Sequence, residues 1–488
     1  MSWWIDNAIT LPDNRLHTPI HMLNDDVLLN IFYLYQLIMS ESYHDIFTFP
    51  HWENAKWWYK PAQVCRRWRY LILASPVRLG LHLVCTFGTP VADMLAHSPP
   101  FPLIINYLDH GFEVSTEDEE AILLALQHRD RVRRIGLGMP APNLPKLIEA
   151  IDGNFPALER LFICPRTKDD TSPVIPPTFQ APHLGMLLLC HACLPLGSPL
   201  LRTTVGLTFL VLMDVPLSAY FEPSYLVAQL SSMPHLEKLS IGFKSPIPAR
   251  HVERQPLHTL IEPHVTLPLR TLYFRGVSAY LEQLLALINS PLLEMLQIHL
   301  FNQLSLTVPY LFQFINRIER FRFSFSRLVF HGELVALIAD CREGDLAEPF
   351  HVAIDCRHAD WQVSAAAQLF NSLAPILSTT EGLALRCQHG LLSQWHEKID
   401  RTQWRNLLKP FSGVKVLYVA EGLIGKLSQS LQLEDGEQPL ELFPELKELV
   451  YYKKDDVSDA YTSFAHARQI AGHPVILTHL PPPPSSWV

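Results

Sequence analysis

The stretch Leu-Glu-Arg-Leu-Phe-Ile, residues 158–163, contains a spacing of apolar residues that returns along most of this chain. The positions that return are those of Leu158, Leu161 and Ile163. The same spacing is found in LGMLLL at 184–189, LTFLVL at 207–212 and LEKLSI at 236–241. Side chains alternate between the two faces of a strand, so the last two apolar positions of each copy share a face. Each copy therefore predicts a short strand with one buried face.

The interval between copies suits a unit of one strand and one helix. Successive copies between residues 132 and 318 begin 23 to 33 residues apart. Helical stretches accompany the copies, for example Thr116–Leu126, where either Ser115-x-x-Asp118 or Thr116-x-x-Glu119 could form a capping box. From 330 to 410 the spacing is faint, with Ile354 and Leu383 as candidates. The first residues of the copies are Val132, Leu158, Leu184, Leu207, Leu236, Leu269, Leu293, Ile318, Val414 and Leu446.

These copies resemble leucine-rich repeats. That family usually places an asparagine eight residues after the first leucine, and none of the copies between 132 and 318 has one there. The turns would therefore be held together by packing. The resemblance implies a solenoid in which parallel strands follow one another in chain order and most connections return as helices. An ordinary α/β domain without repeats is the alternative.

Two amphipathic helices are predicted near the N-terminus. Asn24 can cap the first helix, and Asp25 and Asp26 place negative charge in its first turn. The second helix spans 62–73, after Pro61. The first helix has an apolar stripe of Leu28, Ile31, Phe32 and Tyr35, and the second a face of Val64, Cys65, Trp68, Leu71 and Ile72.

The two helices resemble the halves of an F-box, whose pattern begins Leu-Pro-x-Glu, continues Leu-x-x-Ile-Phe-x-x-Leu and ends Val-Cys-Arg-x-Trp. Asn24 stands where that pattern has proline, and an aromatic insert at 36–60 lengthens the spacer. The run 73–108 is similar to the stretch that follows the F-box in many fungal F-box proteins. The resemblance implies binding to a Skp-type adaptor and, through it, to a cullin–RING ligase. It assigns adaptor binding to Leu23, Leu28, Ile31, Phe32, Leu34, Val64, Cys65 and Trp68.

Size and composition restrict the classes of function. The 488 residues are 48% hydrophobic and 18% charged, so the chain can bury a large core. A net charge of −9 argues against a general nucleic-acid binder. The eight cysteines suggest reduced thiols, and we find neither a signal peptide nor an apolar run of roughly 20 residues. We expect a cytoplasmic or nuclear protein without nucleic-acid or membrane partners.

Sequence motifs for catalysis, cofactors or metals are missing. We find no glycine-rich phosphate loop, no Gly-x-Ser-x-Gly and no His-Glu-x-x-His. Cys190 and Cys193 have a metal-like spacing, but no second pair follows, so we expect ordinary thiols. The sequence predicts a protein that is not an enzyme, needs no cofactor and holds no metal.

Alternation along the strands also predicts an open, concave face. Residues beside and between the last two apolar positions of each copy would point away from the helices. This set is apolar in the middle and carries arginines towards its ends, as protein-binding surfaces do. The alternative is that the strands within 186–213 are buried on both faces. We assign substrate binding to Phe162, Leu188, Val211, Tyr273, Arg275 and Arg322.

The sequence thus predicts an α/β fold in which a small N-terminal helical F-box precedes a leucine-rich-repeat-like solenoid with a curved parallel sheet. The predicted function is that of a substrate-recognition adaptor of an SCF (Skp–cullin–F-box) ubiquitin ligase, with an unknown protein substrate held by the solenoid. The alternative is a leucine-rich-repeat-like protein-interaction scaffold with no ubiquitin ligase role. The predicted parts are an N-terminal extension at 1–19, the F-box-like domain at 20–80, the solenoid at 81–480 and a proline-rich tail at 481–488.

Overall fold

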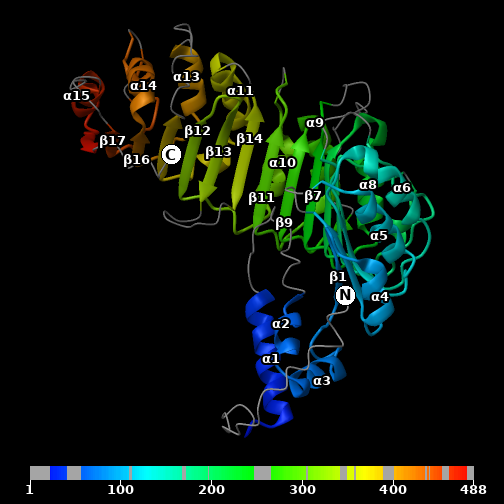
Figure 1. Ribbon diagram of the computed structural model, residues 1–488. Helices are drawn as coiled ribbons and strands as arrows, with labels where there is room; N and C mark the ends of the chain where they lie inside the picture. Colours follow the sequence, from blue (N-terminus) through cyan, green and yellow to red (C-terminus); the bar gives the residue numbers. More distant parts are fainter. Residues whose placement is uncertain are drawn as a thin grey trace. The chain divides into compact units, whose positions relative to one another are not determined.

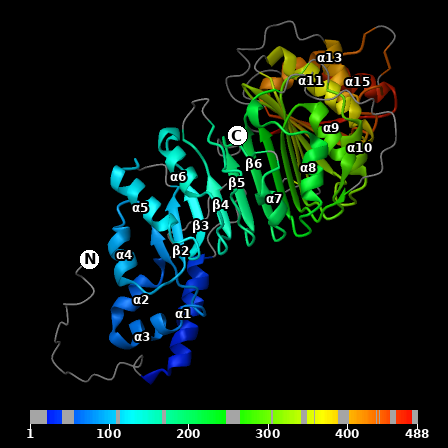
Figure 2. The ribbon, with the colours of Figure 1, turned by 90° about the vertical axis from the view of Figure 1, so that its right-hand side faces the viewer.

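The protein is known from a computed structural model, in which the chain forms two compact units, Met1–Phe209 and Leu210–Val488 (Figures 1 and 2). The predicted N-terminal extension, much of the aromatic insert and the proline-rich tail lie outside the residues that the structure describes. The described residues are 22–40, 56–108, 113–166, 172–195, 197–246, 265–303, 306–340, 349–356, 359–387, 401–434, 437–438, 440–452 and 461–480.

Unit 1 begins with three helices and continues as strand–helix repeats. Its strands are parallel neighbours in chain order, from β1 to β5. The helices are α1 (Asp25–Ser40), α2 (Tyr59–Val64), α3 (Arg66–Ala74), α4 (Val91–His97), α5 (Thr116–Leu126), α6 (Leu144–Ala150) and α7 (Pro199–Thr203). The strands are β1 (Leu83–Cys85), β2 (Leu103–Tyr107), β3 (Val132–Leu137), β4 (Arg160–Ile163) and β5 (Met186–Cys190).

The repeated spacing of apolar residues marks the helix-facing core of unit 1. Ile135, Leu161 and Leu187 are partners on neighbouring strands, and all three are fully buried. Of the two predicted capping boxes, the one at Ser115 forms, because the Ser115 hydroxyl oxygen accepts the Asp118 backbone N–H at 3.1 Å. Two repeat strands, β1 and β2, precede the first copy that the sequence reveals.

Unit 2 contains the remaining strands, beginning with β6 (Phe209–Val215), whose first residue belongs to unit 1. The main sheet has the order β6-β7-β9-β11-β14-β13-β12-β15-β16-β17-β18. Its other strands are β7 (Lys238–Phe243), β9 (Thr271–Gly276), β11 (Met295–Leu300), β12 (Phe325–Phe330), β13 (Leu334–Asp340), β14 (Phe350–Asp355), β15 (Gly382–Cys387), β16 (Val416–Val419), β17 (Glu448–Tyr452) and β18 (Ile476–Leu480).

Helices alternate with most of these strands. A small second sheet pairs β8 (Val265–Thr266) with β10 (Ile288–Asn289). The helices of unit 2 are α8 (Pro223–Leu230), α9 (Ser278–Leu287), α10 (Pro309–Asn316), α11 (Ala359–Ser372), α12 (Ala374–Leu377), α13 (Arg401–Leu408), α14 (Ile424–Leu431) and α15 (Thr462–Ile470).

The predicted chain order is wrong after β11. The copy beginning at Ile318 forms no strand, and β12 begins only at Phe325. β13 is antiparallel to both β12 and β14, and β14 rather than β12 lies beside β11. Phe323 is buried before β12, where it stacks on Phe350 at 5.0 Å between ring centroids. Apolar spacing reports burial, so a buried loop produced the same pattern as a strand.

The predicted second helix, 62–73, is in fact two helices. Cys65 between α2 and α3 is extended, with φ −158° and ψ 169°, and its Sγ accepts the Trp68 backbone N–H at 3.5 Å. Pro61 lies within the first turn of α2, where the backbone N–H groups lack helical partners anyway. The break turns Val64 away from the predicted shared face, and its side chain is exposed.

Candidate protein-docking surfaces

Helix α1 has a buried face that packs against α3. Asn24 caps the helix as predicted, because its side-chain oxygen accepts the Val27 N–H at 2.8 Å. Leu28 and Phe32 are buried, and the Phe32 ring meets Trp68 edge-on at 5.0 Å. These side chains form the interior of the helical segment, which comprises α1, α2 and α3.

Arg67 ties the start of α3 to the start of α1. Its guanidinium forms an ion pair with Asp25 at 2.7 Å and donates a hydrogen bond to the Leu23 carbonyl at 2.5 Å. Arg78 adds a hydrogen bond to the Asn30 side chain at 2.8 Å. The helical segment is therefore held by polar ties as well as by its small core.

A second apolar stripe on α1 remains exposed. Its members are spaced four, three and four residues apart, which puts them on one side of a helix. Their exposed fractions run from 39% for Val27 to 68% for Ile38. The stripe is Val27, Ile31, Leu34 and Ile38. The sequence interpretation included Ile31 and Leu34 but missed Val27 and Ile38, although the same helical spacing would have found them.

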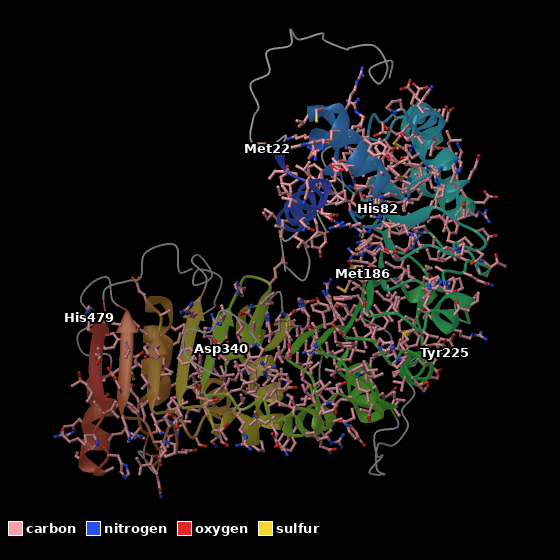
Figure 3. The ribbon with its side chains drawn as sticks, turned by 90° about the horizontal axis from the view of Figure 1, so that it is seen from below. Met22, His82, Met186, Tyr225, Asp340 and His479 are labelled. Carbon is pink, nitrogen blue, oxygen red and sulfur yellow. The ribbon has the colours of Figure 1, made fainter. Side chains whose placement is uncertain are left out.

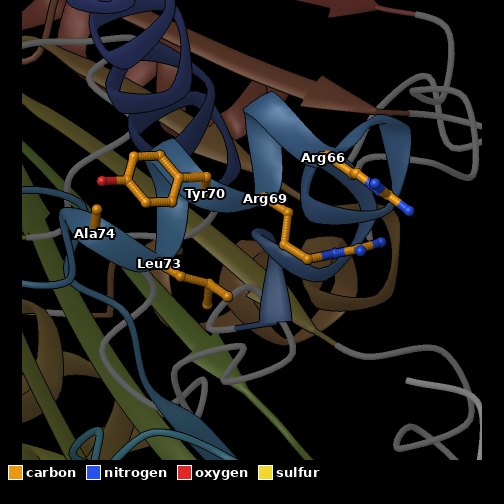
Figure 4. Close-up of a pocket in the computed structure, with 5 residues that line it drawn as sticks. All are labelled: Arg66, Arg69, Tyr70, Leu73 and Ala74. Carbon is orange, nitrogen blue, oxygen red and sulfur yellow. The ribbon is translucent and has the colours of Figure 1, made fainter. Parts of the chain in front are cut away.

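Helix α3 presents its own outward face beside a shallow hollow of roughly 550 Å³ (Figure 4). The hollow combines guanidinium groups with aromatic and aliphatic surface. The Arg69 side chain is fixed by a hydrogen bond from Nε to the Ala62 carbonyl at 3.0 Å. Tyr70 is 73% exposed. The lining residues are Arg66, Arg69, Tyr70, Leu73 and Ala74.

The residues assigned to adaptor binding thus fall into two groups. Leu28 and Phe32 are buried. At the start of α3, the Cys65 Sγ accepts the Trp68 backbone N–H, and the Trp68 ring packs against Phe32. Leu23 is half-buried, and its backbone carbonyl accepts the hydrogen bond from Arg67. The exposed members are Ile31, Leu34 and Val64. The exposed residues can therefore contact a partner directly, while the others support the surface from within the segment.

The open face of unit 1, on the side away from its helices, has an apolar cluster. Val84, Ile104, Leu108 and Phe162 are buried there, and Met186 and Leu188 pack against them half-buried. Phe162 was expected to be exposed, and that expectation is wrong, since only 1% of it is accessible. Its partner on β3 is Gly136.

The open face of unit 2 has a polar cluster on neighbouring strands. The Arg275 guanidinium lies 3.3 Å from Asp214 and 3.8 Å from Asp355. It also lies over the Phe301 ring at 5.4 Å. His299 completes the cluster through its contact with Asp355. This cluster makes that part of the open face polar.

The other residues assigned to substrate binding in unit 2 have different surroundings. Val211 is 8% exposed, so its expected exposure is wrong. Tyr273 is half-buried, and burial raises the pKa of its hydroxyl. Arg322 is exposed but precedes β12 instead of lying in a strand. Leu188, Tyr273 and Arg275 are the assigned strand residues that stay partly accessible.

Within the described ranges, no group of three or more His, Cys, Asp or Glu side chains is arranged to hold a metal ion. Among the described cysteines, Cys190 and Cys193 are not joined in a disulfide. The helices of those ranges are too short or too polar to cross a membrane. A second hollow, of roughly 340 Å³, lies beside α11 and is lined by Asn302, Gln303, Trp361, Ser364, Ala365 and Gln368.

No family model matches the chain, and no curated protein matches it. Among solved structures, it is similar to the leucine-rich repeat-containing protein LegL7 from Legionella pneumophila, at 14% identity and a TM-score of 0.25. The match covers 80% of this chain and 98% of that one. The chain's own topology defines its class as an α/β protein with leucine-rich-repeat-like units.

Proposed function

We propose that this chain is the substrate-recognition subunit of an SCF ubiquitin ligase and that α1, α2 and α3 bind a Skp-type adaptor. The observation that carries the proposal is the exposed stripe Val27, Ile31, Leu34 and Ile38. The opposite face of α1 already supplies the core of the helical segment, so folding of that segment does not require the stripe. Exposed apolar surface of this kind is typical of a protein-binding site.

The stripe is large enough to contribute substantially to binding. Full burial of an exposed aliphatic side chain stabilises by roughly 1.5–3 kcal/mol, and these four are about half exposed. Covering them would therefore contribute roughly 3–6 kcal/mol. The arginines and Tyr70 around the α3 hollow would add polar contacts at the rim of the same kind of interface.

In this proposal the chain is not itself an enzyme. The adaptor connects it to a cullin–RING ligase, and the repeat units hold a protein substrate within reach of the enzyme that transfers ubiquitin. The contribution to catalysis is proximity, which by itself accelerates a reaction between two bound partners.

Co-expression with a Skp-type adaptor tests the proposal. Affinity capture of the full chain should recover the adaptor in near-equal amounts, and the two should leave a size-exclusion column together. A tag-only bait provides the control. Recovery of the chain without adaptor would leave a protein-interaction scaffold without a ligase role as the better interpretation.

A further inference from the structure

Two arginines lie side by side on the open face of unit 1. Arg134 of β3 and Arg160 of β4 are direct strand partners, so their backbones are about 4.8 Å apart. Both side chains are half-buried. The pKa of Arg134 is lowered to about 10, first by burial and then by the positive charge of Arg160. The pair therefore concentrates positive charge at a partly desolvated place.

The charge of this pair is only partly compensated by the described residues around it. The carboxylate that acts on Arg134, Glu159, forms an ion pair with Arg133 at 2.9 Å. Its attraction for Arg134 is weaker than the repulsion from Arg160. The Nε of Arg134 is buried, and no described group accepts a hydrogen bond from it. Buried donors and charges without partners are costly, so an anion placed here would be stabilised.

A histidine extends the polar part of the surface. Burial, followed by the charge of Arg134, lowers the pKa of His82 to about 4, so its ring is neutral at physiological pH. Its backbone carbonyl accepts a hydrogen bond from Trp58 Nε1 at 3.1 Å, which holds this segment against α2. A neutral imidazole can donate a hydrogen bond to an anion without adding charge.

Apolar surface begins on β5, the strand next to β4. Met186 is the partner of Arg160 on β5, and Leu188 is the partner of Phe162. Met186 and Leu188 are half-buried beside the cluster that contains Phe162. Figure 3 labels His82 and Met186 on this side of unit 1. Met186 therefore continues the row of the arginine pair, while Leu188 lies two residues further along β5, about 6.6–6.8 Å from that row. The arginine pair and Leu188 thus match residues i and i+2 of an extended peptide.

We propose that this face binds an extended segment of a partner protein in which an anionic residue is followed two positions later by a large apolar one. The anion would lie at Arg134 and Arg160, and the apolar side chain at Leu188 and Met186. This inference rests on the proposed function, for which it names the class of substrate. The anion is either a carboxylate or a phosphate, and both present oxygen acceptors to guanidinium groups.

Labelled peptides of the sequence acetyl-Gly-Ser-X-Gly-Leu-Gly-Ser test the site, with X as phosphoserine, glutamate or serine. Fluorescence anisotropy with the full chain should show binding of the phosphoserine or glutamate peptide and much weaker binding of the serine peptide. Comparison of the two anionic peptides distinguishes phosphate from carboxylate. Arg134→Gln or Arg160→Gln should weaken binding roughly tenfold or more, because a charge-assisted contact is lost.

Arg133→Gln is the matched control, since it removes the same charge from the adjacent residue, which already has Glu159 as its partner. It should leave peptide binding nearly unchanged, and thermal melting confirms that all variants fold. Equal losses for Arg133 and Arg134, no binding of any peptide, or tighter Arg134-dependent binding of a single-stranded oligonucleotide would overturn the inference. Adaptor capture of the same variants separates the two proposals, because it should be unaffected by either arginine substitution.

Discussion

Glu282 shows how one buried residue connects neighbouring repeat units. It lies on α9, is 3% exposed and accepts the backbone N–H groups of Tyr310 and Leu311 at 2.6 and 2.9 Å. It thereby caps α10, whose own N-cap residue Val308 makes no side-chain hydrogen bond. Burial raises the pKa of this carboxyl to about 7, although the two hydrogen bonds oppose the shift.

Glu282→Gln should change the pH dependence of stability. The folded-state pKa, about 7, exceeds the ordinary glutamate value of 4.5, so the folded protein binds this proton more tightly than the unfolded chain. The stabilisation is complete below pH 4.5 and declines as pH rises to about 7, by roughly 3 kcal/mol in total. Glutamine does not titrate, so the variant should lack this decline. Urea unfolding at pH 5 and pH 8 measures it, and equal pH dependence of the two proteins would contradict the assignment.

Gly413 occupies a position where no side chain fits. A Cβ there would come within 2.1 Å of the Ser378 carbonyl oxygen, which is backbone and cannot turn aside. We expect Gly413→Ala to destabilise by about 1–3 kcal/mol or more. A Cβ added at Gly425 in α14 would lie in open space, so Gly425→Ala should stabilise the protein by up to about 1 kcal/mol. Equal melting temperatures for the two variants would show that this close approach is not real.

At the scale of elements, α1 is a helix with one face for folding and another available for a partner. Phe32→Ala should destabilise the helical segment by about 3–5 kcal/mol, because its ring is buried against Trp68. Leu34→Ala should cost little, because that side chain is 57% exposed. Hydrogen exchange of the α1 amides measures both. Similar loss of protection in the two variants would mean that the faces were misassigned.

The repeat elements could be predicted because their core positions recur at strand spacing. Copies such as those at Leu158 and Leu184 lead directly into β4 and β5. The break between α2 and α3 could not be predicted, because it depends on a side-chain cap from Cys65 within a continuous helical pattern. The position of β13 could not be predicted either, because the insertion of an antiparallel strand depends on pairing between distant strands and not on the local spacing of apolar residues.

At the scale of the whole molecule, sequence and structure agree on a helical N-terminal segment followed by repeat units. Strand alternation correctly separated helix-facing from open-face residues, but it left open whether the open face is buried, which was the alternative for the strands within 186–213. Phe162 is buried there because Leu108 and other open-face neighbours cover it. The partly compensated pair Arg134 and Arg160 was visible as two arginines on neighbouring strands, but the lack of a partner for Arg134 Nε required coordinates.

The most direct measurement is the dissociation constant of a Skp-type adaptor for the full chain and for the double variant Ile31→Asp with Leu34→Asp. Both side chains are exposed, so the variant should melt like the wild type. Charges buried in an interface should weaken adaptor binding by at least about 100-fold. Leu292→Asp is the control, since Leu292 is also 57% exposed and lies in unit 2, and it should bind like the wild type. Unchanged binding by the folded double variant would contradict adaptor docking through α1.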